Sequence, residues 1–261
     1  MEILAVAGLA FLASGLTLFS GFGLGTILMP AFALIMPVEV AIAATAVVHL
    51  ANNVFKLWLV GAAADRGVVV RFALPAALAA VVGAAVLVRL SDLPTIVSYT
   101  AFGADRSIEA LPLAIGLTIV LFAVLELAPG FARLSFPRRL LPLGGVISGF
   151  FGGLSGNQGA FRTAFLIKAG LSKEAFIATG VVAAVVVDVT RLGVYGLSHV
   201  TRDFAALPPE VWPVVAVATA SAFVGAFAGA RLMRKVTLHV VRMVVAVAMI
   251  GLGAGLASGL L

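Results

Sequence analysis

The chain has 261 residues, of which 62% are hydrophobic and 11% are charged, and its formal net charge at pH 7 is +6. With a mean hydropathy of +1.21, this composition excludes a soluble protein and predicts a polytopic membrane protein without a separate soluble domain. The absence of cysteine excludes thiol chemistry and cysteine-ligated metal sites. The positive charge lies mostly in loops, where it reports membrane topology and gives no reason to expect a nucleic-acid partner.

Apolar runs of roughly the 20 residues that span a bilayer recur along the chain. They predict an all-α fold, because a segment in lipid must satisfy its own backbone hydrogen bonds and the alternation typical of a β-barrel is absent. Breaks between the runs give ten helical segments: 3–19, 24–36, 38–61, 70–90, 108–128, 140–154, 159–170, 173–197, 211–233 and 238–260. Segments 24–36 and 159–170 are too short to cross the hydrocarbon at about 1.5 Å per residue, so we expect half-helices or arms of re-entrant hairpins. About eight to ten segments therefore lie in the membrane.

The loops between these segments differ in charge. Three are basic with little acid, and they contain Arg66 and Arg71, then Arg133, Arg138 and Arg139, then Arg231, Arg234 and Lys235. Two are balanced or acidic, and they contain Asp92, Asp105, Arg106 and Glu109, then Arg202, Asp203 and Glu210. We expect the chain to lie in the inner (plasma) membrane of the cell. The positive-inside rule then puts the basic loops in the cytoplasm and both termini on the outer side.

The sequence also repeats itself weakly at a spacing of 135 residues. Ser20-Gly21 matches Ser155-Gly156, Glu39 matches Glu174, Asn53 meets Asp188 and Lys56 meets Arg191. Because each half crosses the membrane an odd number of times, the spacing predicts two inverted repeats, residues 1–130 and 131–261, within one integral membrane domain. Many secondary transporters use this arrangement for alternating access around a site at the midplane.

Each half opens on a glycine-rich break, "SGFGLGT" at 20–26 and "SGNQGAF" at 155–161. Glycines let the backbone leave the helix, and the unpaired N–H groups of the following half-helix favour an anion. The alternative is that these glycines only permit close helix packing. The candidate substrate-binding residues at the breaks are Gly21, Gly23, Gly25, Gly156, Asn157, Gln158 and Gly159.

Arg162 follows the second break by one helical turn. An arginine at bilayer depth costs about 2.5 to 3.5 kcal/mol on insertion scales, so it usually faces a partner or a cavity. We therefore expect Arg162 to bind the anion; snorkelling toward the membrane surface and a structural ion pair are the alternatives.

Two long segments carry polar residues on one face. In 38–61 these are His49, Asn52, Asn53 and Lys56, at positions i, i+3, i+4 and i+7, and in 173–197 they are Asp188, Arg191 and Tyr195. We expect Asn52, Asn53, Lys56 and Arg191 to contact the substrate, and His49 or Asp188 to carry protons. Two alternatives stay open: Lys56, about 7 Å from its helix end, snorkels to the interface beside Trp58, and Asp188 only neutralises Arg191. Glu39 and Glu174 begin their helices, where dipole compensation explains them, so they are left out of the site.

Two stretches carry a family resemblance. "PVEVAIAAT" at 37–45 and its echo "LSKEAFIATG" at 171–180, each after a glycine-rich break, resemble the TauE/SafE sulfite exporter family of membrane permeases over nearly the whole chain. The resemblance implies transport of sulfite, sulfonates, thiosulfate or other small organosulfur or carboxylate anions, with the substrate region at 20–25 and 155–159. The breaks depart from the family's denser glycine run, since amides and an arginine stand in "GNQGAFR".

The predicted function is thus a secondary transporter of a small anion, with no enzymatic activity, no cofactor and no bound metal. No G-x-x-x-x-G-K-[ST] motif is present, so transport would be either facilitated or driven by an ion gradient, of protons or sodium. The expected partners are the small anion, the lipid bilayer and this coupling ion; the oligomeric state is not specified by the sequence. One alternative is an intramembrane serine hydrolase using Ser155 of Gly153-Leu154-Ser155-Gly156, which needs a histidine within hydrogen-bond reach. Another is a membrane assembly or sensor subunit that moves nothing.

Overall fold

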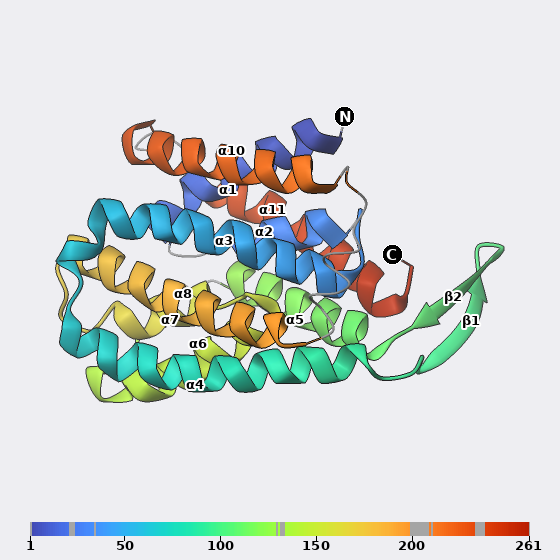
Figure 1. The fold of residues 1–261 in the computed structure, drawn as a ribbon, viewed down its shortest axis with the longest axis horizontal. Helices are drawn as coiled ribbons and strands as arrows, with labels where there is room; N and C mark the ends of the chain where they lie inside the picture. The colour runs from blue at the N-terminus through green and yellow to red at the C-terminus, as the bar shows by residue number, and fades with distance from the viewer. Residues whose placement is uncertain are drawn as a thin grey trace.

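The apolar runs fold into helices throughout the computed structural model, which describes residues 2–20, 24–33, 35–128, 130, 134–198, 209, 211–232 and 238–260 (Figure 1). Within these residues there are ten α-helices: α1 (Glu2–Ser20), α2 (Leu24–Ala33), α3 (Val38–Val60), α4 (Arg66–Ser91), α5 (Ala110–Leu127), α6 (Leu141–Ser155), α7 (Gly159–Leu166), α8 (Lys173–Gly196), α10 (Val211–Leu232) and α11 (Leu238–Ser258). Two short 3-10 turns, η1 (Gly61–Ala63) and η3 (Arg138–Leu140), lead into α4 and α6. Each predicted segment coincides with one helix, so the all-α membrane fold is confirmed.

Helix length separates the spanning segments from the short ones. In the described chain, four helical stretches are both long and apolar enough to cross a membrane: Val38–Ala63, Arg66–Ser91, Lys173–Gly196 and Val211–Ala228. The two segments predicted to be short are shorter still, because α2 has 10 residues and α7 has 8. At about 1.5 Å per residue neither can span the hydrocarbon alone.

A β-hairpin stands where the sequence predicted only a connection. Strands β1 (Val97–Ala101) and β2 (Ala104–Ile108) pair antiparallel with Val97 opposite Ile108, and Phe102 and Gly103 form the tip with positive φ. The hairpin extends beyond the helices in Figure 1 and is tied to the end of α11, where Tyr99 Oη donates to the carbonyl of Ser258. Two five-residue strands, of which only β1 alternates apolar and polar residues, were too weak a pattern to stand out beside long apolar helices.

The ends of the molecule differ in charge, as the predicted topology requires. The chain termini and the hairpin lie at one end in Figure 1, and η1 and the start of α8 lie at the other. Exposed cations gather near that second end: Arg66, Arg71, Arg138, Arg139, Lys168 and Lys173. Which end faces the cytoplasm stays a prediction.

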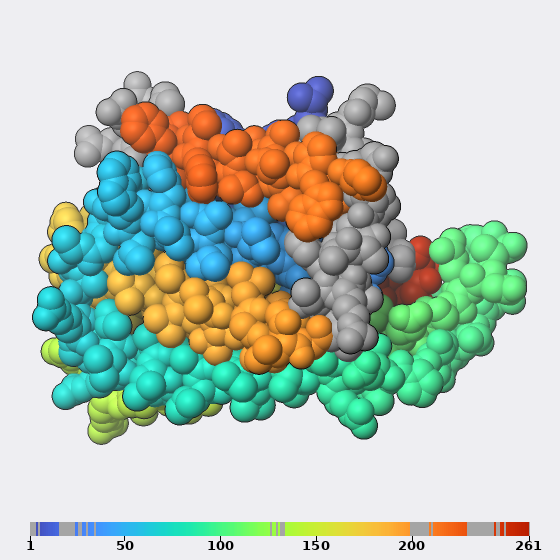
Figure 2. All heavy atoms as spheres, in the orientation of Figure 1, coloured from blue at the N-terminus to red at the C-terminus, as the bar shows by residue number. Residues whose placement is uncertain are grey.

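The surface of the bundle is apolar and its interior is partly polar. In Figure 2, α10, α3, α8 and α4 lie side by side across one face. The outer sides of these helices expose large apolar residues, among them Val54, Leu74, Leu78, Val82, Val189 and Val224, each about half exposed or more. Lipid tails cover such a surface without cost, whereas polar groups must find partners inside.

The helix packing keeps its pattern when the two halves are exchanged. The 135-residue spacing pairs α1 with α6, α2 with α7 and α3 with α8, and chain order pairs α4 with α10 and α5 with α11. Exchanging the halves turns the contact of α1 with α10 into the contact of α6 with α4, and both contacts are present. The contacts of α3 with α8 and of α5 with α11 each join a helix to its own counterpart, so the exchange leaves them unchanged. One apolar core joins α1, α2, α3 and α10, and another joins their counterparts α6, α7, α8 and α4. This pattern is consistent with an inverted repeat, but both the repeat and its boundary near residue 130 stay predictions.

The tightest of these contacts, between α4 and α6, depends on glycine. A Cβ on Gly145, Gly149 or Gly153 would overlap the carbonyl oxygen of Phe72, Ala76 or Ala80, respectively. The three glycines recur every fourth residue and therefore face the same side of α6. Small residues on one face let helix backbones approach closely in membranes. Close packing thus explains the glycines within α6, but not those of the break that follows it.

Candidate functional site

Polar side chains gather in the middle of the bundle, where the surroundings are otherwise apolar. The buried polar residues include Ser14, Thr45, His49, Asn52, Asn53, Lys56, Ser148, Ser155, Asn157, Gln158, Arg162, Asp188 and Arg191. They come from α1, α3, α6, the break before α7, α7 and α8, so both halves of the chain contribute. Buried polar groups are costly unless they are paired or functional, and ionisable ones inside a membrane commonly mark a substrate or ion path.

Asp188 is the centre of a hydrogen-bonded group that we call the Asp188 cluster: Asp188, Arg191, His49, Asn53 and Gln158. Oδ1 accepts from Arg191 Nε at 3.1 Å, Arg191 Nη2 at 2.8 Å and Gln158 Nε2 at 3.3 Å. Oδ2 accepts from His49 Nδ1 at 2.6 Å and Asn53 Nδ2 at 3.3 Å. The Asp188–Arg191 pair, an open alternative in the sequence, is therefore present, and both side chains are fully buried.

The link between His49 and Asp188 was not predicted. The two residues lie 139 positions apart, on α3 and α8. Helical periodicity assigns each to the polar face of its own helix but does not show that the faces meet. Asn53 and Asp188, which the repeat spacing makes equivalent, are also hydrogen-bonded to each other, as residues beside an internal two-fold axis can be.

Gly156 shapes the break at the end of α6. Its φ of +81° lies in the left-handed region, and a Cβ there would sit 2.7 Å from Arg191 Nη1. Only glycine meets both requirements, because it adopts positive φ without strain and leaves room for the guanidinium. The first break reaches the same place, since a Cβ on Gly25 would lie 3.3 Å from the carbonyl oxygen of Gly156. Gly21 and Gly23 lie outside the described residues.

The amides of the second break are only partly satisfied. Asn157 Nδ2 donates to Ser155 Oγ at 3.1 Å, and Gln158 Nε2 donates to Asp188 Oδ1 at 3.3 Å. The main-chain carbonyl of Gln158 accepts from Ser148 Oγ at 2.8 Å. In the described chain, Asn157 Oδ1, Gln158 Oε1 and Arg191 Nη1 are buried without a hydrogen-bond partner. Such atoms in a native interior call for a ligand, an ion or water.

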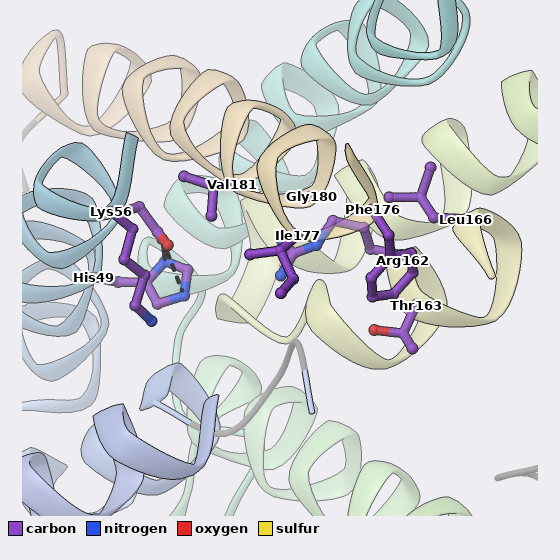
Figure 3. A pocket seen from close by; sticks show the side chains of 10 residues that line it. His49, Lys56, Arg162, Thr163, Leu166, Phe176, Ile177, Gly180 and Val181 are labelled. Atoms are coloured by element: carbon purple, nitrogen blue, oxygen red, sulfur yellow. Dashed lines mark hydrogen bonds between the residues drawn. The ribbon is translucent and has the colours of Figure 1, made fainter. Parts of the chain in front are cut away.

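A small cavity of about 40 Å³ adjoins the Asp188 cluster between α3, α7 and α8. Its polar lining is His49, Asn53, Lys56, Arg162 and Thr163, and its apolar lining is Leu166, Phe176, Ile177, Gly180 and Val181. Figure 3 shows His49 and Lys56 reaching in from α3 and Arg162 from α7 on the opposite side. The lining residues stand near the end of α3, the end of α7 and the start of α8, so the cavity lies toward the basic end of the bundle.

The predicted site residues divide between this cavity and its surroundings. Four of them line it, namely His49, Asn53, Lys56 and Arg162. Arg191, Asp188 and Gln158 lie behind it in the Asp188 cluster, Asn157 and Gly159 lie at the break, and Asn52 Oδ1 accepts from Ser14 Oγ at 3.2 Å. Sequence reasoning missed Thr163 and the apolar wall, because one more isoleucine or phenylalanine carries no signal in so apolar a chain.

The structure rejects the snorkelling interpretation of Lys56. Its side chain is buried, with 4% of the residue exposed, whereas Trp58 nearby is 80% exposed. Lys56 therefore points into the bundle and Trp58 points outward. Arg162 is likewise buried, at 7% exposure, so it does not reach the membrane surface either.

Comparison with protein families identifies the chain. The family model for the sulfite exporter TauE/SafE matches residues 6–256, which include every residue of the cavity and of the Asp188 cluster. The chain belongs to the TauE/SafE family. Searches of curated proteins and of solved structures found no match. TauE/SafE membership makes this a membrane transport protein for sulfite or related anions, in a family of transporters and not of enzymes.

Proposed function

We propose that this TauE/SafE protein is a secondary transporter that binds a small anion in the cavity between α3, α7 and α8. One observation carries the proposal: two cationic side chains from different helices, Lys56 and Arg162, line a single cavity inside the bundle. Burying two cations at this depth costs free energy, and ionisable residues inside a membrane commonly mark the path of a substrate or ion. Membership of the family supports sulfite or a related anion as the substrate. The candidates that we propose are sulfite, a sulfonate, thiosulfate and a small organic acid.

The cavity suits an oxyanion with a small apolar part. Arg162 and Lys56 supply charged donors, and the amide of Asn53 and the hydroxyl of Thr163 add neutral ones. Charge-assisted hydrogen bonds to an oxyanion are about twice as strong as neutral ones. The wall of Phe176, Ile177 and Val181 would accept an alkyl group, which inorganic anions lack.

The two halves offer a route for alternating access. The repeat spacing pairs Lys56 with Arg191; in the described state Lys56 lines the cavity and Arg191 is held by Asp188 behind it. If the two halves exchange conformations, Arg191 lines a cavity that opens toward the other end of the bundle, and Lys56 takes the position behind that cavity. The coupling ion, a proton or sodium, would drive this exchange.

Reconstitution tests the transport function directly. Proteoliposomes holding the purified protein should take up sulfite, thiosulfate, an alkylsulfonate or a small carboxylate faster than protein-free liposomes, without ATP. A protein that is folded yet moves none of these anions would instead support the assembly or sensor alternative.

The hydrolase alternative has less support from the geometry around Ser155. Its hydroxyl donates to the Phe151 carbonyl at 3.2 Å and accepts from Asn157 at 3.1 Å. In the part of the chain that the structure describes, no histidine bonds to Ser155, and His49 is engaged with Asp188. A serine nucleophile needs a base at hydrogen-bond distance.

The orientation in the inner membrane is a separate prediction, with both termini and the hairpin outside. Because the chain has no cysteine, single substitutions give unambiguous labels. Phe102→Cys, at the hairpin tip where 92% of the residue is exposed, should react with a membrane-impermeant thiol reagent added to intact cells. Arg66→Cys, at the basic end, should react only after the membrane is opened. The opposite pattern would reverse the topology.

A further inference from the structure

Lys56 has no counter-ion in the described chain. Its side chain is buried, lines the cavity with Arg162, and forms neither an ion pair nor a hydrogen bond with a described residue. The ion pairs of the described residues near it are those of His49 and Arg191 with Asp188. The side chain of Lys56 therefore borders a cavity whose lining contains a second cation, Arg162.

The carboxylate that could serve Lys56 is already occupied. Both oxygens of Asp188 accept hydrogen bonds, from Arg191 and Gln158 on one side and from His49 and Asn53 on the other. No other carboxylate lines the cavity among the described residues.

Two of the other helices packed against α3, α2 and α10, add no charge along that contact, and α5, which also contacts α3, carries one acidic residue, Glu126. Sequence shows no titratable residue in α2, nor in α10 between Val211 and Ala228. From α8, Tyr195 turns its hydroxyl to the carbonyl of Gly153. Among the residues of the cavity lining and the Asp188 cluster, the charged or titratable groups around Lys56 are His49 on its own helix, Arg162 on α7, and Asp188 with Arg191 on α8.

Lysine and arginine respond differently to burial, because only lysine readily loses its proton. An ammonium group without a partner in an apolar interior is strongly disfavoured, and lysine can relieve this by releasing its proton. Arginine keeps its charge under the same conditions. An anion entering the cavity supplies the missing negative charge and so favours the ammonium form of Lys56. By linkage, each ligand then strengthens the binding of the other.

We propose that Lys56 takes up one proton with each monovalent anion that enters, so that the protein carries anion and proton together. The neutral amine becomes an ammonium ion, and its charge cancels that of the anion. The loaded cavity then has the same net charge as the empty one. The bound anion therefore adds no electrostatic barrier to the change that opens the cavity to the other side of the membrane. This inference rests on the proposed function and identifies its coupling ion.

Ethanesulfonate is a suitable probe, because it stays ionised across the working pH range and cannot carry the proton itself. Proteoliposomes of the full-length protein, with a pH indicator sealed inside, report protons and labelled probe together. The wild type should admit about one proton per anion, and its uptake should be insensitive to an imposed membrane potential. In Lys56→Arg, which keeps the charge but not the releasable proton, the proton-to-anion ratio of the remaining uptake should fall at least several-fold, and that uptake should become sensitive to the potential. Lys168→Arg, on an exposed lysine after α7, is the matched control and should keep the wild-type ratio.

Two results would overturn the inference and leave anion transport standing: wild-type uptake of the probe without protons, or a wild-type ratio in Lys56→Arg. A ratio lost in His49→Gln but kept in Lys56→Arg would likewise overturn it, by assigning the proton to His49. If no anion tested is taken up, the result would instead contradict the proposed function itself. If Lys56→Arg does not fold, the test is the number of protons that the detergent-solubilised wild type takes up when the probe binds. Binding of the anion without proton uptake would overturn the inference.

Discussion

Replacing Asp188 with asparagine is expected to lower the melting temperature of the detergent-solubilised protein by on the order of 10 °C and to abolish transport. The substitution leaves the guanidinium of Arg191 fully buried without its carboxylate and places an amide NH₂ against the donors around it. Breaking a buried ion pair by removing one partner typically costs about 3 to 5 kcal/mol, because the other charge stays buried.

The double variant Asp188→Asn with Arg191→Gln separates charge from packing. It removes both charges and should recover a substantial part of the lost stability, although not transport. Thermal unfolding of the wild type, both single variants and the double variant closes the cycle. Strictly additive losses would show that the Asp188–Arg191 pair does not act as a unit.

Replacing Arg162 with glutamine should weaken binding of the transported anion by roughly 30-fold or more. Removing a buried charge from its partner typically costs about 2 to 5 kcal/mol of binding free energy, and about 1.4 kcal/mol corresponds to tenfold in Kd. Arg162 reaches the cavity from α7 opposite Lys56, so its loss leaves one cation in place of two (Figure 3). Binding by the purified protein and uptake by proteoliposomes should fall together.

Lys168→Gln provides the matched control, because it removes one positive charge from the exposed segment just after the same helix. Its affinity should match the wild type, and its melting temperature should differ little. If Arg162→Gln keeps wild-type affinity, the cavity described above is not the anion site.

The Asp188 cluster and the cavity have complementary roles in this interpretation. The cluster ties α3 to α8 through His49, Asn53 and Asp188 and keeps Arg191 out of the cavity. The cavity beside it keeps Lys56 and Arg162 available to an anion. The paired charges of the cluster therefore link the two halves, and the cations that line the cavity are the ones we propose to bind the substrate.

Much of this protein can be predicted from its sequence. Composition and the length of the apolar runs are sufficient for the all-α membrane class and for ten helices, because lipid leaves the backbone no other way to satisfy its hydrogen bonds. The glycine breaks at Gly25 and Gly156 and the polar faces with Lys56 and Asp188 stand out for a related reason: such residues are costly in a membrane and therefore rare. The hairpin at 97–108 was missed, since short strands outside the apolar runs carry little signal.

Only the tertiary structure decided how these residues are grouped. Periodicity gives the side of a helix on which a residue lies, but the rotation and depth of that helix depend on packing such as the glycine contacts of α6 with α4. That packing turns Lys56 inward, joins His49 to Asp188 across 139 residues, and places Arg162 but not Arg191 on the cavity. The sequence thus determined which polar residues the membrane must accommodate. Contacts between distant helices determined which of them are neutralised by one another and which remain for an anion.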